Sequence, residues 1–346
     1  MANHEGIVSS TGSPGIAVRG DNRIYCNWTH RPIRSASAIT GMFRRLSHIS
    51  EITRDGHTAI PEGRRDVFRG LALRSVVEEL ASTQANNDLP IETAFPVKGD
   101  VWYLGMARNN SSRQNIYTPE EIYQGTRENI RQFNPPLETI NQVLREGYRF
   151  VTSFTPSDRQ LQKSLFTLWH ETFGWKMQQI EGLSHNLTEQ DPKKPSFWFS
   201  ALADPNGNLR AAATAELLEF AGENGEIIRL VESTEWSSTA SNHIKAVADQ
   251  MHAQILDAYP DAVIIAECNY HRGAHRAAQK SGMVSPDVVI GEHIIPQALI
   301  ANVVVNDGKE PRGLRDFSVF TLPHNAISEK ERKDILACTM LDDIYA

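Results

Sequence analysis

The chain has 346 residues and a mass of 38.7 kDa, a length that predicts about two domains. Its hydrophobic content of 40% and charged content of 22% are those of a folded globular protein. The net charge of −7 argues against nucleic-acid binding over the whole surface, and no window approaches the roughly 18 apolar residues of a membrane span.

The three cysteines, Cys26, Cys268 and Cys338, are too few for a disulfide framework and too widely spaced for a metal site. The first twenty residues lack the basic-then-apolar pattern of a signal peptide. Both features predict a reduced, cytoplasmic location.

Residues 1–146 are expected to form an α-rich N-terminal domain without a chemical motif. Apolar spacing and capping residues predict helices over Ser35–Ile52, Arg65–Thr83, Thr118–Phe133 and Leu137–Glu146. Short strands are expected at Ile24–Trp28 and Val101–Ala107.

Residues 147–325 show a more regular alternation of strands and helices, and a charged helix is expected within 326–346. Strands are predicted at Tyr148–Phe154, Phe197–Asp204, Leu209–Phe220, Ile227–Thr234, Asp261–Cys268, Val288–Ile295 and Phe317–Leu322. Helices are predicted to begin at Thr155 and at about Lys176. The pairs Asn206-Gly207 and Asn224-Gly225 predict tight hairpin turns, because both residue types tolerate positive φ.

The stretch Ile227–Met283 is the most informative. A strand ends in a polar loop, the loop opens a helix, and a second apolar strand leads into a basic helix closed by Gly282. This is a βαβα unit, in which ligands bind at the strand ends.

The whole order, β-α-α-β-β-β-α-β-α-β-β, resembles the GNAT (GCN5-related N-acetyltransferase) superfamily over about residues 148–323. His271, Arg276, Lys280 and Gly282 match the pattern that GNAT proteins often carry before the penultimate strand. The segment from His293 to Leu322 is weakly similar to acetyltransferases that act on β-lysine and related amino acids. The resemblance implies an α/β fold with a GNAT-like mixed sheet flanked by helices.

In that family two parallel strands part, the pantetheine of an acyl-CoA lies in the gap, and the pyrophosphate sits on the turn into the next helix. The resemblance places the gap between Ile227–Thr234 and Asp261–Cys268. It implies cofactor contacts from Ser233, Thr234, Trp236, Ser237, Ser238, Thr239, Ala240, Ser241, Asn242, Asn269 and Arg276. The turn Trp236–Asn242 departs from the family pattern because it has no glycine, Arg or Gln, and a Cβ at each position limits close backbone approach.

Acyl transfer to an amine needs a base and donors for the oxyanion. Glu232 and Glu235 at the end of one strand, and Glu216 on the strand before it, are the candidate bases. The alternative is that they are solvated charges at a strand end. The resemblance implies that backbone N–H groups near Ser233–Glu235 form the oxyanion site.

The acid that protonates the leaving thiolate is less defined, because Ala278 stands where many GNAT enzymes have a tyrosine. Tyr270, His271 and Cys268 are candidates, and water is the alternative. His271 and His275 have a spacing that can hold a metal, but contacts to a neighbouring residue or a phosphate explain them better, so no metal is expected.

The sequence thus predicts an N-acyltransferase that moves an acyl group, in the first place acetyl, from acyl-CoA to the amine of a small amino-acid-like metabolite. The N-terminal half is expected to cover the acceptor side of the cleft and to set specificity. No nucleic-acid or membrane partner is expected, and a homodimer is left open. Two alternatives remain. One is a GNAT-fold enzyme that does not use free CoA, acting on a carrier-protein thioester or by hydrolysis or decarboxylation. The other is a non-catalytic binding or regulatory module.

Overall fold

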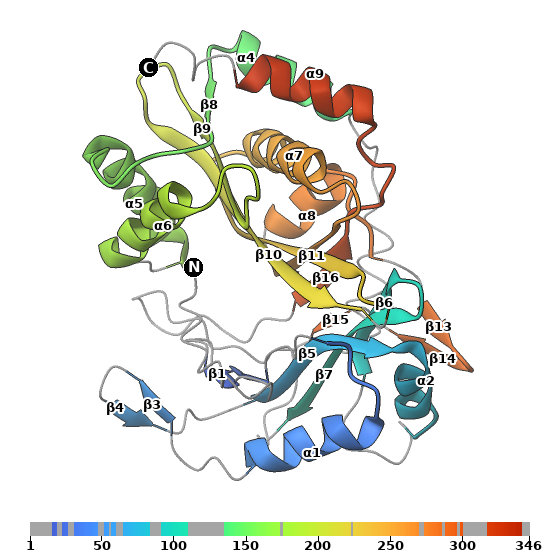
Figure 1. Ribbon diagram of the computed structural model, residues 1–346. Helices are drawn as coiled ribbons and strands as arrows, with labels where there is room; N and C mark the ends of the chain where they lie inside the picture. The colour runs from blue at the N-terminus through green and yellow to red at the C-terminus, as the bar shows by residue number, and fades with distance from the viewer. Residues whose placement is uncertain are drawn as a thin grey trace.

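The computed structural model contains a seven-stranded and a five-stranded β-sheet that lie against each other, each carrying helices, and two further two-stranded sheets (Figure 1). The described residues are 16–18, 23–26, 31–47, 52–54, 57–59, 65–83, 91–109, 135–173, 176–222, 224–269, 273–285, 288–295, 298–299 and 317–340. In this part of the chain every helix is too short or too polar to cross a bilayer.

The C-terminal half is built on a seven-stranded sheet of order β15-β16-β12-β11-β10-β9-β8. Its strands are β8 (Arg149–Val151), β9 (Phe197–Ala203), β10 (Leu209–Ala221), β11 (Ile227–Ser238), β12 (Val263–Asn269), β15 (Ala298–Leu299) and β16 (Phe317–Thr321). Neighbouring strands are antiparallel except β11 and β12, which are parallel. A parallel pair needs a crossover connection, and helix α7 (Ser241–Ala258) supplies it.

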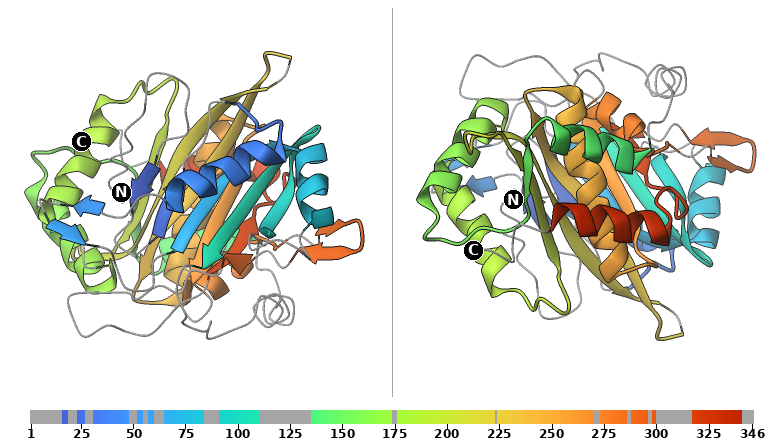
Figure 2. Two further views of the ribbon diagram at one scale, coloured as in Figure 1. Left: turned by 90° about the horizontal axis from the view of Figure 1, so that it is seen from below. Right: turned by 90° about the horizontal axis from the view of Figure 1, so that it is seen from above.

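Helices cover both faces of this sheet, as the two further views show (Figure 2). On one face lie α7 and α8 (Gly273–Lys280), with α4 (Pro136–Arg145) and α9 (Glu329–Thr339) packed outside α7. On the other lie α5 (Arg159–Phe173) and α6 (Met177–Glu189), whose core includes Trp169.

The element order predicted for the C-terminal half is confirmed from β8 to α8 and at β16, including the two hairpin turns at Gly207 (φ 82°) and Gly225 (φ 79°), whereas β15 was not predicted. The single strand predicted at Val288–Ile295 is instead a hairpin of β13 (Val288–Ile290) and β14 (His293–Ile295). Gly291 turns the chain there, with φ 61°. The C-terminal helix begins after Ser328, whose hydroxyl accepts a hydrogen bond from the Glu331 amide.

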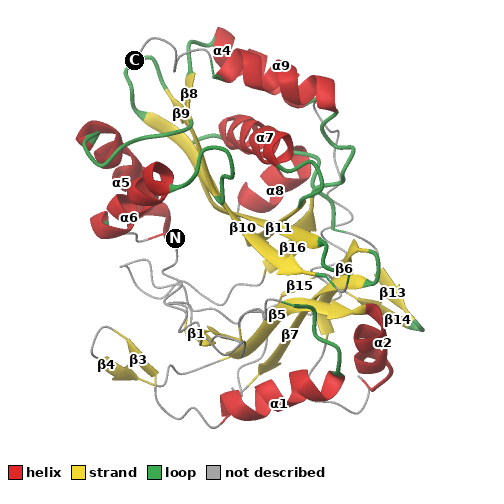
Figure 3. Cartoon of the chain, in the orientation of Figure 1, coloured by secondary structure: helices red, strands yellow, loops and turns green. Residues whose placement is uncertain are grey.

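The N-terminal half is not α-rich among its described residues. It contains a five-stranded sheet of order β1-β2-β5-β7-β6 and a separate β3–β4 hairpin (Figure 3). The strands are β1 (Ile16–Val18), β2 (Arg23–Cys26), β3 (Ile52–Arg54), β4 (His57–Ala59), β5 (Arg65–Leu73), β6 (Ile91–Lys98) and β7 (Val101–Asn109). The helices are α1 (Ala36–Ser47) and α2 (Arg74–Thr83), and the helix predicted over Thr118–Phe133 lies outside the described residues.

The main error in this half concerns Arg65–Thr83, predicted as one helix but divided into β5 and α2. β5 is the middle strand of its sheet, and its residues Phe68 to Ala72 are all buried. A strand buried on both faces has a nearly continuous apolar sequence, which resembles a buried helix.

The two halves share one hydrophobic core. Phe68, Leu104 and Ile39 from the N-terminal half pack in the same cluster as Leu230 and Ile265 from the C-terminal sheet. At the edge of this contact, Lys98 Nζ of β6 donates to the Ile227 carbonyl oxygen at 3.3 Å. The N-terminal sheet therefore covers part of the same sheet face that α5 and α6 cover farther along.

Candidate functional site

The parallel strands β11 and β12 pair over only three residues and then part. The paired Cα positions are Leu230 with Val263, Val231 with Ile264, and Glu232 with Ile265. β11 continues to Ser238 against β10 alone, and β12 continues to Asn269 against β16. The pairing thus ends at Glu232, between the two strands that the GNAT resemblance predicts to separate.

A β-bulge lies in β11 immediately after this point. The ladder with β10 pairs Thr214 with Thr234 and Ala212 with Ser237, so two residues of β11 stand opposite Ala213 alone. The first of the two, Glu235, has φ 55°, the one positive φ of a non-glycine residue among the described residues. A side chain in this region costs about 1–2 kcal/mol, and such strain persists mainly at functional sites.

The C-terminal half has a GNAT-like fold. The order of its elements, the single parallel pair and the parting of that pair are the features that the resemblance predicts.

Comparison with solved structures gives neighbours of low similarity. Arabidopsis thaliana NAA60 in complex with a bisubstrate analogue is 12% identical, covers 51% of this chain and 98% of its own, and has a TM-score of 0.36. L-PGS from Bacillus licheniformis is 12% identical over 96% of this chain and 87% of its own, with a TM-score of 0.33. A Trypanosoma brucei acetyltransferase is 11% identical over 34% of this chain and 81% of its own, with a TM-score of 0.26.

No family model and no curated protein matches the sequence.

A polar strip crosses one face of the sheet beside the parted strands. Thr214 and Thr234 are cross-strand partners whose hydroxyl oxygens are 3.1 Å apart, and Glu216 is the cross-strand partner of Glu232. Because alternate residues share a face, these four side chains project on the same side.

The polar strip lies between two hydrophobic clusters on that face of the sheet. Leu218, the residue that follows Glu216 on this face of β10, packs against the core shared with the N-terminal sheet. Phe199, the partner of Thr214 on β9, packs in the core under α5 and α6. The polar strip therefore lies where the N-terminal sheet and the α5–α6 pair meet.

Glu232 forms a buried ion pair with the N-terminal half. Its Oε1 accepts from Arg69 Nη1 at 2.9 Å and its Oε2 from Nη2 at 3.5 Å, although the residues are 163 positions apart. The side chains are 1% and 7% exposed. Desolvating two charges is expensive, and such pairs form where the geometry brings opposite charges into direct contact.

The turn from β11 into α7 is shorter than predicted. Trp236, Ser237 and Ser238 still belong to the strand, and only Thr239 and Ala240 separate it from the helix. Ala240 is the N-cap and no side chain caps the helix. The backbone N–H groups at a helix start can bind an anion such as a phosphate.

The hydroxyl groups of Ser237, Ser238 and Thr239 form hydrogen bonds within the protein. Ser237 and Thr172 of α5 have hydroxyl oxygens 2.7 Å apart. The hydroxyl of Ser238 donates to the Ala240 carbonyl oxygen at 2.6 Å, and that of Thr239 to the Arg210 carbonyl oxygen at 3.2 Å. Any phosphate held here would depend on backbone amides more than on hydroxyl groups.

Ser233 and Trp236 face away from the polar strip, toward α7. Trp236 is buried and its Nε1 donates to Ser233 Oγ at 2.9 Å. Its ring centroid lies 6.0 Å from that of His252. Trp236 is thus part of the core beneath the parted strands.

His252 and two charged residues are buried on the same helix. Lys245 and Asp249 form an ion pair one turn apart, and burial raises the pKa of Asp249 to about 6 despite this pairing. Burial, with a contribution from Lys245, lowers the pKa of His252 to about 3. Neither ring nitrogen of His252 has a hydrogen-bond partner within the described part of the chain.

The described residues include only some of the other predicted site residues. Tyr270 and His271 lie outside the described residues. Asn242 is half-buried in the first turn of α7, whereas the side chains of Ser241, Asn269 and Arg276 fall outside the description. The described side chains contain no group of three or more His, Cys, Asp or Glu that could hold a metal.

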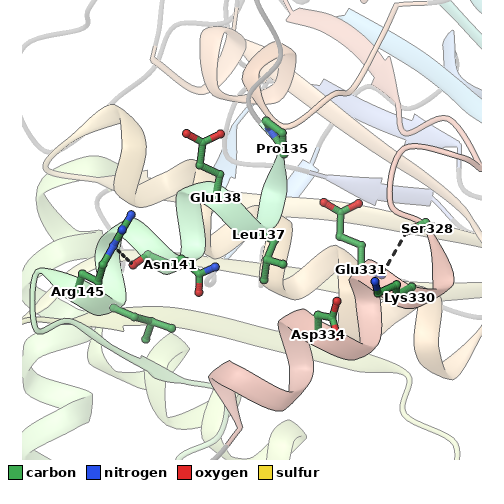
Figure 4. A pocket seen from close by; sticks show the side chains of 10 residues that line it. Pro135, Leu137, Glu138, Asn141, Arg145, Ser328, Lys330, Glu331 and Asp334 are labelled. Carbon is green, nitrogen blue, oxygen red and sulfur yellow. Dashed lines mark hydrogen bonds between the residues drawn. The ribbon is translucent and has the colours of Figure 1, made fainter.

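A groove of about 880 Å³ lies elsewhere, between α4 and α9 (Figure 4). Glu138 and Arg145 line it from α4, and Lys330 and Asp334 line it from α9. Both helices pack on the α7 side of the sheet, away from the polar strip. None of the predicted site residues lines it.

Arg69 and Thr172 contact the site without having been recognised in the sequence. Arg69 stands within the apolar run Val67–Leu73. A charged residue is almost never fully buried unless it is paired, so this position could have signalled a distant carboxylate. Thr172 gives no such signal.

Proposed function

We propose that the C-terminal half transfers an acyl group, in the first place acetyl, from acyl-CoA to the amine of a small amino-acid-like metabolite. The observation that carries the proposal is the end of β11–β12 pairing at Glu232, followed by an uncapped helix. Strand edges that face a gap offer backbone donors and acceptors to an extended amide-containing arm, and the start of α7 offers amides to a phosphate.

The co-substrate would supply the activated thioester, and the chain's own residues would act on the amine. The polar strip brings Glu216 and Glu232 opposite each other beside the point where the strands part. A carboxylate attracts an ammonium group, so these two side chains are candidates for drawing the amine toward the gap.

Glu232 is our first candidate for the base that removes the ammonium proton, because it stands at the last paired position. Glu235, half-buried in the bulge, is the second, and Glu216 the third. Backbone N–H groups at the bulge are the proposed oxyanion donors, because a bulge takes residues out of the regular ladder.

The first test is thermal unfolding with millimolar acetyl-CoA and free CoA. A ligand that binds only the folded state stabilises it by about 2.7 kcal/mol at a concentration of 100 Kd, which should raise the Tm by several degrees. No shift with either ligand would remove acyl-CoA from the proposal and favour a carrier-protein thioester.

The second test separates an enzyme from a binding module. Acyl transfer to a panel of amino acids and diamines is followed through release of the CoA thiol. Glu232→Gln and Glu235→Gln should be compared with Glu226→Gln, a carboxylate in the β10–β11 hairpin turn. Ligand binding with no transfer by the wild type would favour the non-catalytic module. Unchanged transfer in both strand variants would clear both carboxylates of the base role.

A further inference from the structure

Arg69 occupies a position from which the N-terminal sheet reaches the C-terminal one. It lies in the middle of β5, and its cross-strand neighbour on β7 is Gly105, which has no side chain to compete for the space. Gly105 in turn pairs with Thr93 of β6. From this row the guanidinium contacts both oxygens of Glu232, more closely at Oε1 than at Oε2.

The contact is made at the point where the candidate site begins. Glu232 is the last residue of β11 that pairs with β12. The Arg69 side chain therefore fixes the carboxylate at the head of the gap, although none of the predicted site residues comes from the N-terminal half.

Burial makes this contact consequential for the protonation of Glu232. Burial by itself raises the pKa of a carboxyl group. An adjacent guanidinium lowers that pKa by about one to three pH units, because it stabilises the ionised form. Glu216, the cross-strand partner of Glu232, acts in the opposite direction because it carries the same charge. A further buried carboxylate, Glu92, lies at the bulge of β6, next to Thr93.

We propose that Arg69 is a positioning residue, which keeps Glu232 ionised and oriented where β11 and β12 part, so that the N-terminal sheet completes the acyl-transfer site. This inference rests on the proposed function for its catalytic consequence. The effect of Arg69 on the protonation of Glu232 stands independently of it.

The variants are Arg69→Met, which removes the charge, and Arg69→Lys, which keeps the charge but cannot form the bidentate contact. Arg74→Met is the matched control. Arg74 begins the next element and forms an ion pair with Glu78 at 2.8 Å, but both side chains are at least half exposed (59% and 50%).

Two quantities are measured for each variant. The first is the pH profile of kcat/KM for acyl transfer. The second is the titration of the Glu232 side-chain carboxyl by carbon-13 NMR, assigned with Glu232→Gln. Arg69→Met should move the ascending limb of the profile and the NMR midpoint upward by about one to three pH units. Each unit lowers kcat/KM on the limb about tenfold. Arg69→Lys should restore part of the shift, and Arg74→Met should leave both curves in place.

An Arg69→Met protein that is folded and less stable, with both curves unmoved, would overturn the inference and leave Arg69 a purely structural residue. If Arg69→Met does not fold, Arg69→Gln, which also removes the charge but can still donate a hydrogen bond, takes its place, and Arg69→Gln curves that coincide with the wild type would overturn the inference equally. Failure of the proposed function is distinguishable, because a wild type that neither binds CoA nor transfers acyl groups still gives the NMR titration. An upward NMR shift would then support the positioning role alone.

Discussion

Replacing His252 with leucine is expected to change how the stability of the protein depends on pH. The imidazole is fully buried, and neither nitrogen has a hydrogen-bond partner among the described residues. Leucine has a similar volume and favours a helix. At pH 7.5 the substitution should therefore be nearly neutral or slightly stabilising, because an apolar group replaces a buried polar one that gains little.

The magnitude follows from the lowered pKa. Burial, and next the charge of Lys245, lowers the pKa of His252 from 6.5 to about 3. Below pH 6.5 the unfolded chain binds a proton that the folded chain does not, so His252 removes stability as the pH falls. The slope is about 1.4 kcal/mol per pH unit. Between pH 7.5 and 4.5 this slope acts only below pH 6.5, that is, over about two pH units. The wild type should therefore lose about 2.7 kcal/mol relative to His252→Leu.

Asp249 acts with the opposite sign. Its pKa is raised from 3.8 to about 6, so its contribution is lost as the pH rises through this window. The wild type alone would show a partly cancelled slope, whereas the difference between wild type and variant isolates His252. That difference is the quantity to measure.

The assay is urea unfolding followed by tryptophan fluorescence, which reports on Trp236 beside His252. Gln254→Leu is the control, because it alters the same helix without removing a titratable group. Its stability difference from the wild type should not vary with pH. Equal pH slopes for wild type and His252→Leu would refute a neutral, buried imidazole.

Three further predictions concern stability, each measured by the same urea assay. Arg69→Met should destabilise the protein by about 3–5 kcal/mol, because it removes the guanidinium that contacts the buried Glu232 carboxylate, whereas Arg69→Met with Glu232→Leu should recover much of that loss. A lone Arg69→Met effect below about 1 kcal/mol would contradict the buried pair. Trp169→Ala should cost about 3–5 kcal/mol, since Trp169 is fully buried in the core under α5 and α6; a cost as small as that of a surface residue would show that this core is loosely packed. Glu235→Gly should be nearly neutral, because relief of the positive φ offsets the added freedom of the unfolded chain, whereas Glu235→Val should cost more than about 1 kcal/mol. Equal effects of Gly and Val would argue against a positive φ at this position.

The C-terminal element order could be predicted because its signals are local. The turn residues before Gly207 and Gly225 set two hairpins, and the apolar runs between them have the lengths of strands. Local signals do not report how far two strands stay paired. The end of β11–β12 pairing at Glu232, and the bulge at Glu235, depend on contacts with β10, β12 and β16 together.

The N-terminal half shows where such reasoning fails. The apolar positions of Arg65–Thr83 fit a helix, yet the first half of the segment is the central strand of a sheet. The choice was made by the neighbouring strands β2 and β7, which satisfy the backbone of β5 on both sides.

By itself, the sequence determined most of the succession of strands and helices in the described parts of residues 148–323, and it offered three carboxylates that could act on an amine. Only the tertiary structure decided that Glu232 lies at the head of the gap, bound to Arg69 from a sheet 163 residues upstream. The physical reason is that strand and helix periodicity are properties of neighbouring residues. The partner of a buried charge is instead selected by which distant surfaces pack together, and the packing of two sheets into one core made that selection here.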